Sequence, residues 1–234
     1  MPLTELGLTP GTWLLLVGLG GLLAVDGVSF PQIMVSRPLV SATLGGAALG
    51  QPGGGLLVGA VLELLSMRHP PYGAAKYPDT GPAGLVAGAA YAAAGAGSIE
   101  ALVAALIGGW ATGWAGSYAG HARRKLNGHL VANQQALAAR PARLERLVLG
   151  ALAVDFGRGA LITAGFLLPV TLVAGLAAGL RVAGGGAAFG AAALVTALAA
   201  SVGAGARTTA PDGRAWAMVL IGALLAASTL WPGP

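Results

Sequence analysis

Long stretches without a charged side chain constrain this chain more than any other feature of its sequence. Runs free of Asp, Glu, Lys and Arg cover residues 6–25, 38–62, 80–99, 101–122, 159–180, 182–206 and 215–234. A bilayer core is about 30 Å thick and is crossed by about 20 apolar residues in a helix. Runs of this length predict helices that enter or cross a membrane.

Composition excludes the competing classes of protein. Charged residues make up 9% of the 234 residues, against about 25% in soluble domains. The 40 glycines lie among apolar residues, which fits neither collagen nor a disordered chain. We therefore expect an all-α integral membrane protein, a multi-span Gly/Ala-rich helical bundle forming a single polytopic membrane domain over residues 1–234. The first run follows Glu5 instead of a basic segment, so we expect it to be retained as a membrane segment.

The run at 38–62 is unusual because a glycine- and proline-rich turn, residues 50–55, interrupts it. The turn separates two arms, Pro38 to Leu49 and Leu56 to Met67, of about 12 residues each. Such an arm reaches only about 18 Å as a helix. The pattern predicts a re-entrant or broken-helix hairpin around residues 38–67, and the alternative is an ordinary loop between two tilted spans. Discontinuous segments of this kind are where transporters place their substrate sites.

A single basic segment, residues 121–146, indicates the orientation of the chain. It holds six of the thirteen cations, between Arg123 and Arg146, and an excess of Lys and Arg marks cytoplasmic loops. We expect a cytoplasmic amphipathic segment broken at Pro141, followed by C-terminal membrane helices in 147–234. Contact with lipid headgroups is its simplest role, and docking of a soluble partner is the alternative. Because the net charge of +5 is explained in this way, we expect no nucleic-acid partner.

Charges inside apolar runs are the main candidates for function, because each costs about 2.5–3.5 kcal/mol at the centre of a membrane helix. Glu63 has apolar neighbours and no cation three or four residues away. Asp155 and Arg158 are three residues apart on one helix face and are expected to neutralise each other. Glu100 is expected in a turn. The remaining candidates are Asp26, Arg37 and Asp79.

These groups define a substrate-site region at residues 26–90. Carboxylates accept hydrogen bonds from sugar hydroxyls, while Gln32 and Arg37 donate them. A proton relay would use the same carboxylates, so the residues alone leave a sugar site and a proton site open. The chain has no cysteine, no HExxH or GxSxG motif, and no P-loop lysine. We therefore expect no metal, no cofactor and no catalytic residue.

The region from 26 to 90 resembles the membrane subunit IIC of the mannose/sorbose-type sugar phosphotransferase system. The resemblance lies in Asp26 near the end of the first run, Arg37-Pro38-Leu39-Val40, the glycine-rich turn, GLLVGAVLEL at 55–64 and GAAKYPD at 73–79. It continues weakly through the basic segment and ALAVDFGRGALI at 151–162. The order and spacing of these pieces make the resemblance specific.

The resemblance implies a protein of the cell inner membrane that is not an enzyme by itself. Such a subunit forms the sugar pathway with a membrane subunit IID, and soluble IIB, supplied by IIA, phosphorylates a hexose or amino sugar. It also implies substrate-binding residues. Glu63 and Asp79 are the first candidates, followed by Gln32, Ser36 and Arg37, with Asp26 beside them. Arg37 either contacts the sugar or holds Glu63 or Asp26 in place.

Two departures from the family pattern bear on the substrate. Gln51 stands where family members usually have Asp, and residues 67–72 are more polar and more rigid than the usual link. Two other functions stay open. One is an ion-coupled secondary transporter, or a substrate-binding membrane subunit, that uses Glu63 and Asp79. The other is a non-transporting membrane scaffold.

Overall fold

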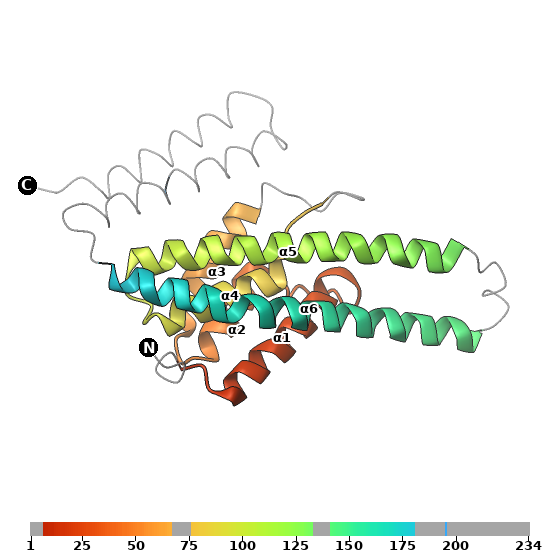
Figure 1. Ribbon diagram of the computed structural model, residues 1–234, viewed down its shortest axis with the longest axis horizontal. Helices are drawn as coiled ribbons and strands as arrows, with labels where there is room; N and C mark the ends of the chain where they lie inside the picture. Colours follow the sequence, from red (N-terminus) through yellow and green to blue (C-terminus); the bar gives the residue numbers. More distant parts are fainter. Residues whose placement is uncertain (1–6, 67–75, 133–140, 181–194, 196–234) are drawn as a thin grey trace, which may run out of the picture.

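The computed structural model describes residues 7–66, 76–132, 141–180 and 195. Within these ranges the chain forms helices and no strand, as Figure 1 shows. The helices are α1 (Pro10–Val28), α2 (Pro38–Ala47), α3 (Pro52–Ser66), α4 (Thr80–Ala93), α5 (Ile99–Ala132) and α6 (Pro141–Gly179). The all-α prediction is confirmed. The runs at 182–206 and 215–234 lie outside the described residues.

Three of the described helices are long and apolar enough to cross a membrane. They are α1, α5 as far as Lys125, and α6 from Glu145. Thr9 caps the start of α1 by accepting a hydrogen bond from the backbone N–H of Thr12, and Pro10 follows at the first helical position. The predicted first membrane segment at 6–25 thus contains a helix that begins at Pro10 and ends at Val28, three residues beyond the run.

The predicted hairpin is confirmed as two short helices, α2 and α3, that pack against each other. With 10 residues, α2 reaches only about 15 Å, which excludes two spans joined by an ordinary loop. Gly50 makes the turn with φ of +76°, a conformation that L side chains rarely adopt. The expected start of the second arm, Leu56, is wrong. Helix α3 begins at Pro52, because proline suits a first helical turn and Gly55, three residues later, allows close contact with α2.

Helix α4 lies at the centre of the bundle. Every residue from Gly81 to Ala92 is buried, as expected for a helix that is apolar on all sides. A Cβ added at Gly88 would come within 2.1 Å of the carbonyl oxygen of Ala42, so α2 and α4 touch backbone to backbone. Helix α4 has only 14 residues, or about 21 Å. It ends before the run at 80–99 does, at a turn where Gly95 has φ of +87°.

The two longest helices, α5 and α6, run antiparallel and extend beyond the rest of the described bundle (Figure 1). Their 34 and 39 residues correspond to about 51 and 58 Å, more than the thickness of a bilayer core. Residues 121–132 of the basic segment continue α5, and Pro141 begins α6 instead of breaking a helix. Glu100 lies in the first turn of α5, which Ser98 caps, and not in the loop before it.

Candidate functional site

A loop at residues 29–37 joins α1 to α2 and carries three of the predicted site residues, Gln32, Ser36 and Arg37. Its conformation is irregular: the Phe30–Pro31 bond is cis, and Gln32 and Met34 have φ of 59° and 69°. Gln32 is exposed and Ser36 is buried. The 29–37 loop therefore exposes the amide of Gln32, whereas Ser36, near the end of the loop, is buried in the helix bundle.

Asp26 organises this loop from the last turn of α1. Its side chain is buried, and its two carboxylate oxygens accept hydrogen bonds from the backbone N–H groups of Ile33, at 2.8 Å, and Ser36, at 2.9 Å. Backbone donors of an irregular loop need such partners, because few of them bond within the loop. Asp26 thus supports the loop from inside.

Arg37 and Glu63 form an ion pair between the start of α2 and the last turns of α3. The Arg37 Nη1 atom lies 2.6 Å from Glu63 Oε1, and the backbone N–H of Leu39 lies 3.3 Å from Oε2. The side chain of Arg37 is 55% exposed and that of Glu63 is 19% exposed. Of the two carboxylates that Arg37 was expected to hold, the structure pairs it with Glu63. Within the described residues, the contacts of these two groups leave some of their hydrogen-bonding positions unused, and a polar ligand could bind there.

Asp79 lies just before α4 and connects that helix to α6. It occupies the N-cap position, yet its side chain makes no capping hydrogen bond. Instead Oδ2 lies 2.5 Å from Arg158 Nη1, and the backbone N–H of Asp79 bonds to Gly113 in α5 at 2.8 Å. The next residue, Thr80, donates its hydroxyl to the carbonyl of Ser36 at 3.1 Å. Asp79 is therefore linked to the 29–37 loop without facing the Arg37–Glu63 pair.

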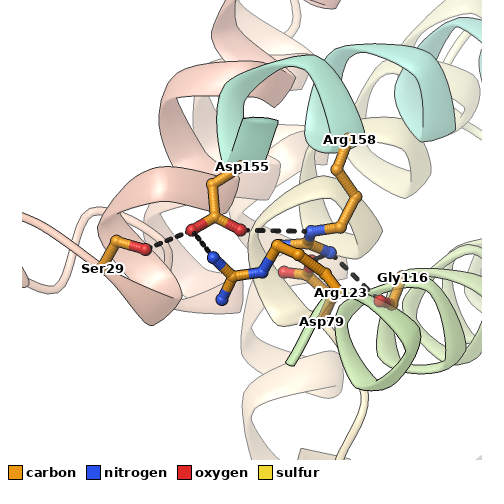
Figure 2. A network of polar contacts seen from close by, with 6 residues as sticks. All are labelled: Ser29, Asp79, Gly116, Arg123, Asp155 and Arg158. Carbon is orange, nitrogen blue, oxygen red and sulfur yellow. Dashed lines mark hydrogen bonds and ion pairs between the residues drawn. The ribbon is translucent and has the colours of Figure 1, made fainter. Parts of the chain in front are cut away.

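Four charged side chains meet between α4, α5 and α6, as Figure 2 shows. We refer to them as the charge cluster, which consists of Asp79, Arg123, Asp155 and Arg158. The side chain of Arg123 is 12% exposed, that of Asp79 is 8% exposed, and those of Arg158 and Asp155 are 7% and 0% exposed. Its two acids and two bases balance, which lowers the cost of burying them.

The contacts of the charge cluster add partners to the expected pair of Asp155 and Arg158. These two groups do meet, at 3.6 Å, but each has a closer partner on another helix. Asp155 lies 2.6 Å from Arg123 and also accepts a hydrogen bond from the hydroxyl of Ser29. Arg158 pairs with Asp79. In this structure the partners on neighbouring helices lie closer to Asp155 and Arg158 than these two residues lie to each other.

Gly116 in α5 makes room for the Asp79–Arg158 pair. A Cβ added at Gly116 would lie 2.6 Å from the Cβ of Asp79, and the Gly116 carbonyl accepts a hydrogen bond from Arg158 Nη1 at 3.0 Å. Three buried atoms of the cluster have no hydrogen-bond partner within the described part of the chain. They are Arg123 Nε, Asp155 Oδ1 and Arg158 Nε.

The comparison with protein families agrees with this architecture. The family model of the sorbose-specific IIC component of the phosphotransferase system (PTS) matches residues 12–202. The chain belongs to this family. No curated protein and no solved structure matches it. The match confirms the resemblance seen at 26–90 and extends it over most of the chain. A PTS IIC component is a sugar transport subunit of the membrane, and phosphoryl transfer takes place on other subunits.

The predicted site residues of this IIC component fall into two connected groups. Gln32, Arg37 and Glu63 lie at or near the surface, whereas Asp26, Ser36 and Asp79 are buried and bonded to other parts of the protein. Gln51 stands immediately before α3, where an Asp side chain would suit an N-cap. The stretch 67–72 lies outside the described residues.

Sequence reasoning missed three residues that contact the predicted site residues, the 29–37 loop or the charge cluster. Ser29 and Thr80 carry common hydroxyls with no distinguishing pattern, and Arg123 was counted with the cytoplasmic cations. A signal for Arg123 did exist. Arg123 and Asp155 lie on opposite sides of the 133–140 segment, on α5 and α6, so an antiparallel pairing of these two helices can bring them together. No group of three or more His, Asp or Glu residues suited to a metal occurs in the described ranges.

Proposed function

We propose that this IIC component forms the membrane pathway for a hexose or amino sugar together with a IID subunit. It presents the sugar to phosphorylated IIB, which receives its phosphoryl group from IIA. Phosphorylation then traps the product, because a phosphate dianion does not easily recross hydrocarbon. We further propose that the protein lies in the cell inner membrane with residues 121–146 on the cytoplasmic side, as the excess of cations in that segment supports.

The observation that carries the proposed sugar site is the exposed Arg37–Glu63 ion pair on the broken-helix hairpin. A sugar hydroxyl both donates and accepts, so it can bond to the carboxylate and to the guanidinium at once. The exposed amide of Gln32 adds a further donor and acceptor from the 29–37 loop. In this proposal Glu63, Arg37 and Gln32 contact the sugar.

The buried residues of the predicted set, Asp26, Ser36 and Asp79, support the proposed sugar site without contacting the sugar. Asp26 and Ser36 hold the loop through backbone hydrogen bonds, and Asp79 acts through Arg158 and Thr80. Because Asp79 is buried against a cation, its proposed role is support and not direct contact with the sugar. In this proposal, three of the six polar residues contact the sugar and the other three hold them in place.

The proposal is tested by sugar uptake in cells that lack their own mannose-type system. This chain is expressed with candidate IID and IIAB proteins from neighbouring genes, and labelled hexoses and amino sugars are supplied. We expect sugar phosphate to accumulate, and we expect Glu63→Gln to abolish the accumulation at equal membrane level. Glu100→Gln is the matched control, since it makes the same chemical change at the start of α5 and leaves the site intact.

Two outcomes would contradict the proposal. Accumulation of free sugar without IIB, sensitive to the proton gradient, would indicate an ion-coupled secondary transporter. Equal behaviour of wild type and Glu63→Gln for every sugar, with no accumulation in either, would favour a scaffold that does not transport.

A further inference from the structure

The 29–37 loop needs support from outside because it has little regular structure of its own. Phe30, Ile33 and Met34 are each at least 64% exposed, so they contribute little packing against the rest of the described protein. The loop also contains two residues with positive φ that are not glycine. A segment of this kind occupies a single conformation only when surrounding contacts hold it.

The described contacts hold the loop at three places. Asp26 bonds to the backbone N–H groups of Ile33 and Ser36. The hydroxyl of Ser29, at the start of the loop, donates to Asp155. The hydroxyl of Thr80 donates to the carbonyl of Ser36, near the end of the loop. The second and third contacts lead to the same place, because Asp155 belongs to the charge cluster and Thr80 follows Asp79 directly.

Arg158 connects these two anchors. It pairs with Asp79 at 2.5 Å, approaches Asp155 at 3.6 Å and donates to the carbonyl of Gly116 at 3.0 Å. One guanidinium therefore positions both anchors of the loop. It contacts the carboxylate of Asp155, which bonds to Ser29 at the start of the loop. It also contacts the carboxylate of Asp79, and the next residue, Thr80, bonds to Ser36 near the end of the loop. A planar group with several donors suits this bridging role, whereas the single ammonium of a lysine does not.

Stability alone does not account for the charge cluster. Well-packed apolar residues often stabilise a protein as well as a buried ion pair does. Within the described residues, three polar atoms of the cluster have no hydrogen-bond partner, and two of them, Asp155 Oδ1 and Arg158 Nε, meet only at 3.6 Å. What the cluster provides is a set of directional contacts to a loop that apolar packing does not hold.

We propose that the charge cluster positions the 29–37 loop for sugar binding, with Asp155 and Arg158 as positioning residues that act through Ser29 and Thr80. This inference rests on the proposed function, because the loop carries Gln32 and Arg37. It adds a specific role for residues that lie on α6, behind the sugar site. Neither residue touches the sugar.

The most direct test removes the two hydroxyl groups that anchor the loop and leaves the charged residues of the cluster unchanged. Ser29→Ala and Thr80→Val each delete one hydroxyl with little change in volume. In the complete transport system, with IID and IIAB present, we expect each variant to raise KM about fivefold, as for one lost hydrogen bond. Vmax should change less than twofold, and the membrane level should match wild type. Ser117→Ala is the control, since its buried hydroxyl has no partner in the described structure and does not reach the loop.

Arg158 variants test the centre of the cluster. Arg158→Gln should raise KM more than either anchor variant does, and Arg158→Lys should give an intermediate KM because it keeps the charge but cannot bridge both carboxylates. If Arg158→Gln fails to accumulate in the membrane, the anchor variants decide the question. An unchanged KM in both Ser29→Ala and Thr80→Val would overturn the proposal.

A second measurement separates this proposal from the proposed function. The chain has no cysteine, so Ile33→Cys introduces a unique site for a spin label on the exposed part of the loop. In purified protein in lipid nanodiscs, the label should become more mobile when Ser29→Ala or Thr80→Val is added, but not when Ser117→Ala is added. If the wild type transports no sugar while the label still responds, the proposed function fails and the positioning of the loop stands. An unresponsive label in a transporting protein would refute the positioning role.

Discussion

Two ion pairs in this protein differ in what surrounds them. Arg37 and Glu63 pair at a surface that a ligand can reach, whereas Arg123 and Asp155 pair where the acid is fully buried. An exposed pair contributes only about 0.2–1 kcal/mol to stability, which is compatible with the binding role that we propose for it. A buried pair contributes little net stability, yet breaking it is costly because one charge remains uncompensated.

Neutralising the buried acid should therefore destabilise the protein. Asp155→Asn leaves Arg123 without its carboxylate partner, and we expect a loss of about 3 kcal/mol or more, seen as a melting temperature lower by several degrees in detergent-purified protein. Removing the cation as well, in Arg123→Gln with Asp155→Asn, should restore part of the loss. The single variant Arg123→Gln completes the cycle, and if the losses of the two single variants simply add in the double variant, the two side chains are not coupled.

Neutralising Glu63, which is partly exposed, should affect sugar uptake far more than stability. Glu63→Gln should change the free energy of unfolding by about 1 kcal/mol at most, while sugar uptake is lost. The melting temperature and uptake of one preparation test both parts. A large drop in melting temperature would mean that Glu63 serves the fold more than the site.

At the scale of the helices, close contact between α2 and α4 builds the bundle. In lipid, helices associate through packing and hydrogen bonds, and small residues let their backbones approach. Gly45 faces the backbone of α4, and Gly88 faces the carbonyl of Ala42 in α2. Neither position has space for a Cβ unless a helix moves. Because the arms of the hairpin are short, this contact fixes where the Arg37–Glu63 pair lies.

A side chain at Gly88 should therefore force α2 and α4 apart. We expect Gly88→Val to lower stability by about 1–3 kcal/mol or more and to weaken uptake, since α2 carries Arg37 at its start. Gly53→Val is the matched control, because nothing lies within 4 Å of a Cβ at that position. Thermal unfolding of both variants, with uptake beside it, checks this expectation. Equal effects of the two substitutions would rule out the close contact as the cause.

At the scale of the whole molecule, α5 and α6 set the orientation. Each is longer than the bilayer core, so one end of the pair must project from it. The apolar part of α5 ends at Lys125, and the cations of the basic segment begin at Arg123. The projecting end is thus the basic one, and the positive-inside rule supports our proposal that it lies in the cytoplasm.

Single cysteines in this cysteine-free chain test that orientation. Gly128→Cys, at an exposed position in the projecting part of α5, should react with a membrane-impermeant maleimide only when the cytoplasmic side is accessible. Gly97→Cys, before the start of α5, should react only from the opposite side. Labelling of intact cells against inverted vesicles distinguishes the two sides. Reaction of both cysteines from one side would contradict a single crossing by α5.

Much of the fold could be predicted from the sequence. Apolar runs indicated the membrane, and the turn at 50–55 indicated the hairpin, because these signals are local and strong. The family resemblance around Asp26, Arg37 and Glu63 pointed to a IIC component, which the family match confirms. Helix ends were less certain, as the early start of α3 at Pro52 shows, since glycines that break an isolated helix are tolerated where another helix packs on them.

The pairing of charges was decided only by the tertiary structure. The sequence alone determined that a few acids and bases lie in apolar surroundings, because composition and spacing suffice for that. It did not determine that Arg158 meets Asp79 or that Ser29 meets Asp155. Helical periodicity specifies which face of a helix a residue occupies, but the partner on the next helix depends on how the helices pack. That packing depends on backbone contacts such as Gly88 against Ala42, which join residues far apart in the chain.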